Sequence, residues 1–170
     1  MLEELSPDAK HVAILYCSAE ANSKYQATEF EKYLDEDGIS YTEFTASDSN
    51  DIGSVVQSAT EYADVIYIPT DNTMAQNTEA INNIALPAGT PIIAGEEGIC
   101  KGCGVATISI SYYDIGKQAG AKAYDILVNG EDITTMKIET APNVTKEYNK
   151  DISDQLGVKI PDDYKAIEAE

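Results

Sequence analysis

Apolar residues along this chain follow two alternating spacings. Short runs of consecutive apolar residues are typical of buried parallel strands, and stretches with an apolar residue every three or four positions are typical of amphipathic helices. The runs predict strands at 11–17, 40–45, 64–69, 90–95 and 105–110. The helical spacing predicts helices over 23–37, 52–63, 74–85 and 115–127.

This order of elements predicts the fold class. Repeated strand–helix units favour an α/β fold with a doubly wound, mostly parallel sheet of about five strands and helices on both faces. The end of the chain is less regular, with an expected strand at 136–139 and a short helix at 150–156. We therefore assign residues 1–130 to an α/β lobe and residues 131–170 to a C-terminal tail of the same domain.

Composition narrows the function classes. The 170 residues include 30 Asp and Glu against 11 basic residues, a formal net charge of -19. Nucleic acids and anionic membranes are recognised through cationic surfaces, so we expect neither as a partner. The first seven residues lack the charged and apolar segments of a signal peptide, and we expect the chain as given to be soluble.

The three cysteines do not indicate a metal site or a redox site. Cys100 and Cys103 form a C-x-x-C pair within a glycine-rich stretch, without a second pair or a nearby histidine. A structural zinc site needs four ligands, and a redox pair normally opens a helix. We interpret 98–104 as a loop that holds two thiols, and we expect no metal and no cofactor.

Catalytic motifs are also missing. The chain has neither the G-x-G-x-x-G nor the Walker A phosphate loop, and it lacks the G-x-S-x-G elbow of α/β hydrolases. His11, the single histidine, begins the first predicted strand and so lies at the edge of the sheet opposite the carboxyl ends of the strands. The adjacent pair Glu96 and Glu97 could act as a base, but no catalytic partner is evident. We predict a protein that is not an enzyme.

Polar residues gather where the predicted parallel strands end, the edge at which open α/β sheets bind ligands. They follow four strands, at 18–23, 70–73, 95–98 and 111–114. Helix N-termini at this edge favour a carboxylate, whereas the acidic side chains Glu20, Asp71, Glu96 and Glu97 favour an ammonium group. Capping alone is the simpler explanation, and the pairs Ser23–Gln26, Thr73–Gln76 and Ser111–Asp114 are spaced as capping boxes.

Several of these stretches resemble a known family. Residues 14–23, 67–73, 93–98, 112–120 and 155–161 closely resemble the substrate-binding proteins of ABC transporters in the tryptophan/tyrosine-binding group. The resemblance implies a lobe of the periplasmic-binding-protein type I fold. In such proteins an aromatic amino acid or a related zwitterion is closed between two lobes and delivered to an ABC permease. It also implies an extracytoplasmic parent, either a lipoprotein or a periplasmic protein.

The resemblance covers the second lobe of such a protein, and it suggests the ligand-binding residues. They are Ser18, Glu20, Asn22, Ser23, Thr70, Asp71, Asn72, Thr73, Glu96 and Ser111, with Tyr112 positioned to stack on an aromatic ligand. Family members usually carry Asp at the position of Ser111. The chain here keeps a helix cap at that position but loses the charge.

Without a first lobe, the helix at 113–128 needs another surface for its apolar stripe. We expect it to fold back on its own sheet, which gives the flavodoxin-like strand order 2-1-3-4-5. The alternative is a homodimer in which two chains exchange this segment. In either case we expect weak or no binding of free aromatic amino acids.

Two function classes compete with solute binding. A flavodoxin-like flavin protein would need a phosphate loop after the first strand, and a receiver-like signalling module would use Asp71 as its phosphorylated residue. An enzyme with Glu96 or Glu97 as base is the other alternative.

Overall fold

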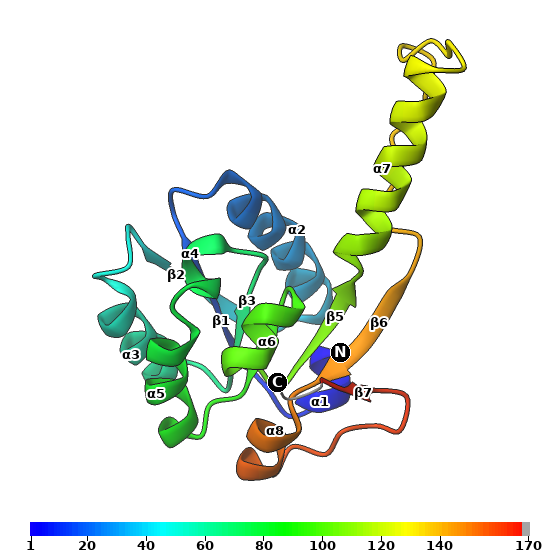
Figure 1. The fold of residues 1–170 in the computed structure, drawn as a ribbon. Coiled ribbons are helices and arrows are strands. Elements are labelled where there is room, and N and C mark those ends of the chain that lie inside the picture. The colour runs from blue at the N-terminus through cyan, green and yellow to red at the C-terminus, as the bar shows by residue number, and fades with distance from the viewer. Residues whose placement is uncertain (168–170) are drawn as a thin grey trace.

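Within residues 1–167, the part of the chain that this computed structural model describes, seven strands form one sheet in the order β2-β1-β3-β4-β5-β6-β7 (Figure 1). Their bounds are β1 (His11–Cys17), β2 (Ser40–Ala46), β3 (Val65–Ile68), β4 (Ile92–Ala94), β5 (Ala106–Ile110), β6 (Val144–Tyr148) and β7 (Lys165–Ala166). The first five strands are parallel and have the predicted order, whereas β6 pairs antiparallel with β5. The α/β class is confirmed, with two more strands than expected.

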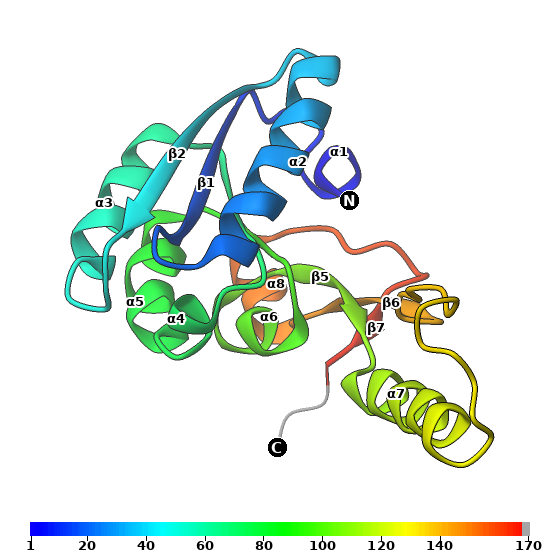
Figure 2. The same ribbon diagram turned by 90° about the horizontal axis from the view of Figure 1, so that it is seen from above.

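Helices cover both faces of the sheet. They are α1 (Leu2–Leu5), α2 (Ala21–Asp37), α3 (Ile52–Tyr62), α4 (Asn72–Ala75), α5 (Thr78–Ala88), α6 (Glu97–Cys103), α7 (Tyr112–Leu127) and α8 (Lys150–Leu156). Seen from above, α1 and α2 lie on one face and α3, α4 and α5 on the other (Figure 2). The strands between them are buried on both sides, because β1 from Val12 to Cys17 is at most 3 % exposed. This explains why the strands read as continuous apolar runs.

The helix bounds follow local signals. Both α2 and α5 end at a glycine, Gly38 and Gly89, with φ of 69° and 75°. A left-handed residue at this position is the common helix stop, and glycine adopts it without a steric penalty. The predicted helix at 74–85 is two helices, α4 and α5, separated by Gln76 and Asn77.

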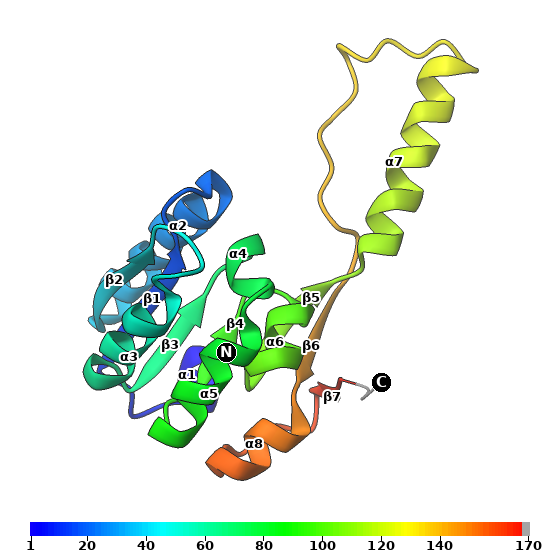
Figure 3. The ribbon, with the colours of Figure 1, turned by 60° about the vertical axis from the view of Figure 1, so that its left-hand side comes forward.

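Helix α7 and the segment after it form an arm that stands away from the sheet (Figures 1 and 3). No residue of α7 is buried. The returning segment stays beside α7, where Gln118 donates to Glu139 and the Lys122 ammonium donates to the carbonyl of Lys137 at 3.0 Å. The predicted return of this helix to its own sheet is therefore wrong.

The space for such a return is filled by other parts of the chain. The N-terminal helix α1 packs Leu5 in one cluster with Ala106 of β5 and with Tyr164 near the C-terminus. In addition, β6 occupies the position beside β5, where Ile110 and Val144 are paired residues at the two roots of the arm. Exchange of the arm between two chains stays a prediction.

Two local predictions also fail. The stretch 136–139 is not a strand, because it runs along α7, and the strand of this region, β6, begins at Val144. The stretch 98–104 is not a loop but most of α6, which buries Cys100 and Cys103. Glycine at 102 serves packing here, since an added Cβ would lie 2.2 Å from the hydroxyl oxygen of Thr78.

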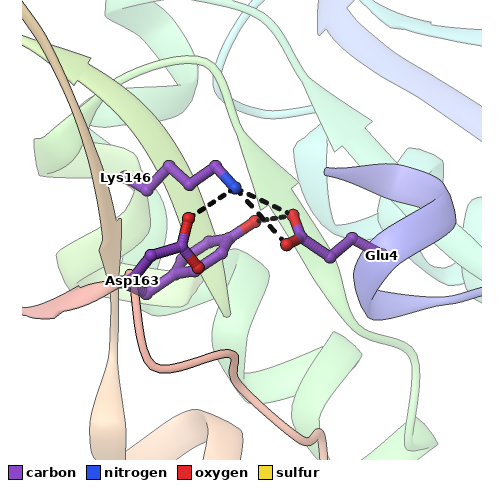
Figure 4. Close-up of polar contacts among 4 residues, drawn as sticks. Glu4, Lys146 and Asp163 are labelled. Carbon is purple, nitrogen blue, oxygen red and sulfur yellow. Dashed lines mark hydrogen bonds and ion pairs between the residues drawn. The ribbon is translucent and has the colours of Figure 1, made fainter.

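A polar cluster joins the two ends of the chain to β6 (Figure 4). The Lys146 ammonium lies 3.2 Å from Glu4 of α1 and 2.8 Å from Asp163. The Tyr164 hydroxyl donates to the same Glu4 carboxylate at 2.8 Å, and the Lys146 ammonium lies 4.9 Å from the centre of the Tyr164 ring. Residues far apart in sequence thus meet beside the strands that carry the arm.

Candidate functional site

The loops that follow β1, β3 and β4 meet at one edge of the sheet. We call them together the rim: residues 18–23 after β1, 69–73 after β3 and 95–98 after β4. Because these strands are parallel neighbours, their carboxyl ends lie at the same edge. The helices α2, α4 and α6 begin within or directly after these loops.

Glu20 joins the first two loops. One of its oxygens accepts hydrogen bonds from the backbone N–H and the side-chain amide of Asn72, both at 2.9 Å. The other accepts from the backbone N–H of Thr73 at 2.8 Å and from its hydroxyl at 2.9 Å. Partial burial raises the pKa of Glu20, but these four hydrogen bonds outweigh it and lower the pKa to about 2. The carboxylate therefore remains ionised at neutral pH.

The same two loops are linked a second time through Thr70. Its carbonyl accepts from the Asn22 amide at 2.8 Å and from the Ser23 hydroxyl at 3.0 Å, and its N–H donates to Gln26 at 3.0 Å. The predicted capping box Ser23–Gln26 is therefore wrong, because both side chains bind the neighbouring loop and α2 starts earlier, at Ala21.

Asp71 is a buried structural anchor, with 1 % of its surface exposed. Its carboxylate caps α4 by accepting from the N–H of Met74, and it also accepts from the N–H of Cys17, each at 2.8 Å. The predicted capping box Thr73–Gln76 is not formed, because Asp71 is the N-cap residue of α4. A buried carboxylate with both oxygens occupied is not placed to accept a phosphoryl group, which weighs against the receiver-like alternative.

The third loop joins the rim through a close backbone approach. The Thr70 hydroxyl donates to the carbonyl of Gly95 at 3.2 Å, and a Cβ at Gly95 would lie 2.6 Å from backbone atoms of Pro69 and Thr70. Glycine is needed here because no side chain fits between the two loops. The next residue, Glu96, caps α6 by accepting from the N–H groups of Gly98 and Ile99.

Three predicted site residues lie outside this network of hydrogen bonds. The Ser18 hydroxyl donates to the carbonyl of Ala46 at the end of β2. Ser111 accepts from the N–H of Asp114 and thus caps α7, as its capping box predicts. Tyr112 is 60 % exposed at the root of the arm. In the described chain neither Ser111 nor Tyr112 forms a hydrogen bond or ion pair with the rim.

Two residues that hold the rim together, Gln26 of α2 and Gly95, were not among the predicted site residues. Gln26 lies one turn into a helix, and its spacing from Ser23 indicated a cap rather than a contact with Thr70, 44 residues away. Gly95 lies at the end of an apolar run, and only the distance to Pro69 explains it. A glycine that closes a buried strand at the ligand edge is the signal that could have identified it.

The C-x-x-C thiols belong to the core. Burial raises the pKa of Cys103 to about 12, and burial together with the neighbouring Cys103 also raises the pKa of Cys100. The thiolate is the reactive form, so both side chains are held in the inert form. Across residues 1–167, no group of three His, Cys, Asp or Glu side chains is arranged to hold a metal ion.

Membrane-spanning segments were searched over the same described residues. None of the helices there is both long enough and apolar enough to cross a bilayer.

The sheet order and the polar rim at its carboxyl edge are typical of α/β lobes that bind a ligand. Comparison with known proteins gives the family: residues 1–169 match the model of ABC transporter substrate binding proteins, and the chain belongs to that family. A curated relative, the tyrosine-binding protein of Clostridioides difficile, is 28% identical over 151 residues, which cover 89% of this chain and 44% of the relative.

Solved structures show the same similarity. A ligand-free, open substrate-binding protein with adhesive properties from Clostridium difficile is 29% identical, with a TM-score of 0.80 over 99% of this chain and 58% of its own. An ABC domain in complex with L-Trp from Streptococcus pneumoniae is 28% identical, with a TM-score of 0.85 over 95% of this chain and 54% of its own. A conserved domain protein from Vibrio cholerae is 28% identical, with a TM-score of 0.87 over 97% of this chain and 57% of its own. The chain thus spans about half the length of these relatives.

Proposed function

We propose that this chain is a solute-binding lobe of an ABC importer, which holds one side of an aromatic amino acid or a related small zwitterion without catalysis. The observation that carries the proposal is the convergence of three loops, 18–23, 69–73 and 95–98, on one rim through hydrogen bonds. Relatives whose names or titles mention tyrosine or L-Trp support the ligand class.

The ligand site would draw on the whole predicted set, either by direct contact or by positioning. The set is Ser18, Glu20, Asn22, Ser23, Thr70, Asp71, Asn72, Thr73, Glu96, Ser111 and Tyr112. Ser111 and Tyr112 would join from the end of β5, the next strand along the edge.

The arm supports a two-lobe parent. Its helix α7 carries apolar side chains with no buried residue, and the chain matches about half the length of its relatives. We propose that a first lobe covers the arm and supplies the other half of the ligand contacts. Residues 1–130 and the tail at 131–170 would then together form the second lobe and its connections to the first lobe. An ABC permease and an extracytoplasmic location follow for the parent.

Nuclear magnetic resonance titration of the 170-residue chain with L-tryptophan tests this function. With only half of the contacts present, we expect affinity no better than millimolar and amide shifts confined to the rim. The Asn22→Ala variant should lose these shifts. The matched control, Asn83→Ala, changes an exposed residue of α5 and should keep them. Shifts centred on the opposite edge, around 38–40 and 62–64, would contradict the site. Micromolar affinity in a monomer would contradict the need for a first lobe.

A further inference from the structure

Three of the four acidic side chains of the rim, Glu20, Asp71 and Glu96, are already occupied by donors from their own lobe. The two oxygens of Glu20 accept four hydrogen bonds from Asn72 and Thr73, at 2.8 to 2.9 Å. An ionised carboxylate offers about four lone-pair sites. A ligand ammonium group could bind Glu20 only by displacing donors of the 69–73 loop.

Asp71 and Glu96 are occupied in the same way. Asp71 accepts from Cys17 and Met74 and is almost fully buried. Glu96 accepts from two N–H groups at the start of α6. Each of the three carboxylates therefore binds backbone donors at the start of a helix, where a negative charge is also favoured by the helix dipole.

We propose that Glu20 is a positioning residue of the ligand site rather than the partner of a ligand ammonium group. It fixes the 69–73 loop against the 18–23 loop, so that the exposed side chains of both loops are held in one arrangement. The inference rests on the proposed function, because it assigns a role within that site.

With Glu20, Asp71 and Glu96 occupied, none of these three side chains distinguishes an amino acid from an analogue that lacks the ammonium group. The negative charge that selects the amine must come from outside these three side chains.

The test compares two ligands and two variants. L-tryptophan and 3-indolepropionate share the ring and the carboxylate, and only the first carries an ammonium group. The Glu20→Gln variant loses the anionic acceptor, and the Glu36→Gln variant removes the same charge from an exposed position at the other end of α2, away from the rim. The measurement is the dissociation constant of each ligand from amide shifts of the 170-residue chain.

We expect Glu20→Gln to raise the dissociation constants of both ligands by the same factor, about tenfold for the loss of one good hydrogen-bonded arrangement. The ratio of the two dissociation constants should stay unchanged. Glu36→Gln should change the affinity for neither ligand. Loss of L-tryptophan binding alone in Glu20→Gln would overturn the proposal, because it would show that Glu20 meets the ammonium group.

A ligand-free measurement distinguishes failure of this proposal from failure of the proposed function. In the wild-type chain, the carboxyl carbon of Glu20 and the amides of Asn72 and Thr73 should titrate together, well below the ordinary range of a glutamate. Titration of Glu20 near its ordinary value would overturn the positioning role. If the chain binds neither ligand but this titration is as expected, the proposed function fails in the isolated chain and the positioning role stands.

A second variant, Thr73→Val, tests the same proposal with a smaller change. If Glu20→Gln does not fold, Thr73→Val removes one of the four donors and keeps the charge. It should shift the amide resonance of Asn72 and raise the dissociation constants of the two ligands equally, by a smaller factor than Glu20→Gln. An unequal effect on the two ligands would again contradict the proposal.

Discussion

The carboxylate of Asp71 accepts a hydrogen bond from the backbone N–H of Cys17 at 2.8 Å, although the two residues are 54 positions apart. This bond joins the end of β1 to the start of α4, because the second oxygen of Asp71 accepts from Met74. The two loops that bear most of the predicted site residues are therefore fixed to each other through the buried Asp71 carboxylate as well as through Glu20.

Replacement of Asp71 by alanine should destabilise the fold. The change leaves the N–H groups of Cys17 and Met74 without their acceptor in a buried position, at a cost of about 2–3 kcal/mol in the free energy of unfolding. Urea denaturation followed by circular dichroism measures it. The control Asp8→Ala removes an exposed carboxylate and should change stability by less than about 0.5 kcal/mol. Equal effects of the two variants would contradict the anchoring role.

Gly95→Ala should be the most disruptive small change in the rim. The added Cβ would lie 2.6 Å from the backbone of Pro69 and Thr70, so the two loops must separate, and we expect a loss of about 1–3 kcal/mol. In Gly53→Ala, the Cβ would lie 3.9 Å from Ile84 on a helix, which is an ordinary contact, and stability should be unchanged or slightly higher. Thermal denaturation of the pair tests the close approach, and a neutral Gly95→Ala would disprove it.

Glu20 should make stability depend on acidic pH. Its pKa is lowered from 4.5 in the unfolded chain to about 2 in the fold, so its stabilising effect is complete above pH 4.5 and declines as the pH falls toward 2. Between about pH 5 and pH 3 we expect the wild type to lose about 1–2 kcal/mol more than Glu20→Gln. Urea midpoints of both proteins across this range measure the difference, and parallel curves would contradict the low pKa.

Lys146 should hold the N-terminal helix and the C-terminal segment against β6 (Figure 4). In Lys146→Met we expect faster hydrogen exchange at α1 and around Asp163 and Tyr164, because Glu4 and Asp163 lose their shared cation. Lys150→Met is the matched control, since it also removes a lysine from an ion pair, with Asp154 within the single helix α8. Exchange at α1 that is the same in both variants would show that the packing of Leu5 and the hydrogen bond from Tyr164 to Glu4 hold the helix without Lys146.

The sheet was predictable because burial on both faces leaves a direct trace in sequence. The prediction for β1 agrees with the structure at both ends, and the order of the first five strands follows from the repeated strand–helix units. The arm was not predictable in this way. An apolar stripe such as that of Ile115 and Ile126 shows that a surface is needed, but the stripe is the same whether that surface belongs to this chain or to another.

The chemistry of the rim was also easier to predict than its connections. Residue types and strand ends indicated Glu20, Asp71 and Glu96 as a group at one edge. The sequence does not show that Glu20 and Asp71 accept from Asn72 and Cys17, because these donors become neighbours only when loops about 50 residues apart meet. Helix α6 was missed since its two glycines are usual in loops, and the reason for Gly102 is the contact with α5.

The arm should be dispensable for folding of the rest. Its roots, Ile110 and Val144, are paired residues on antiparallel strands, so a two-residue Asn-Gly turn in place of residues 111–143 would close β5 and β6 into a hairpin. Because no residue of α7 is buried, we expect the urea midpoint of the shortened chain to equal that of the full chain.

The same shortened chain decides between a free and an exchanged arm. The arm leaves large apolar side chains in solvent, with Leu127 82 % and Ile138 99 % exposed, and such a surface favours association. Light scattering should show a monomer for the shortened chain. If the full chain is then a dimer, two copies cover each other's arms. If it is a monomer with the same midpoint, the arm is free for a first lobe. A shortened chain that unfolds at lower urea would contradict both, because it would show that the arm stabilises its own sheet.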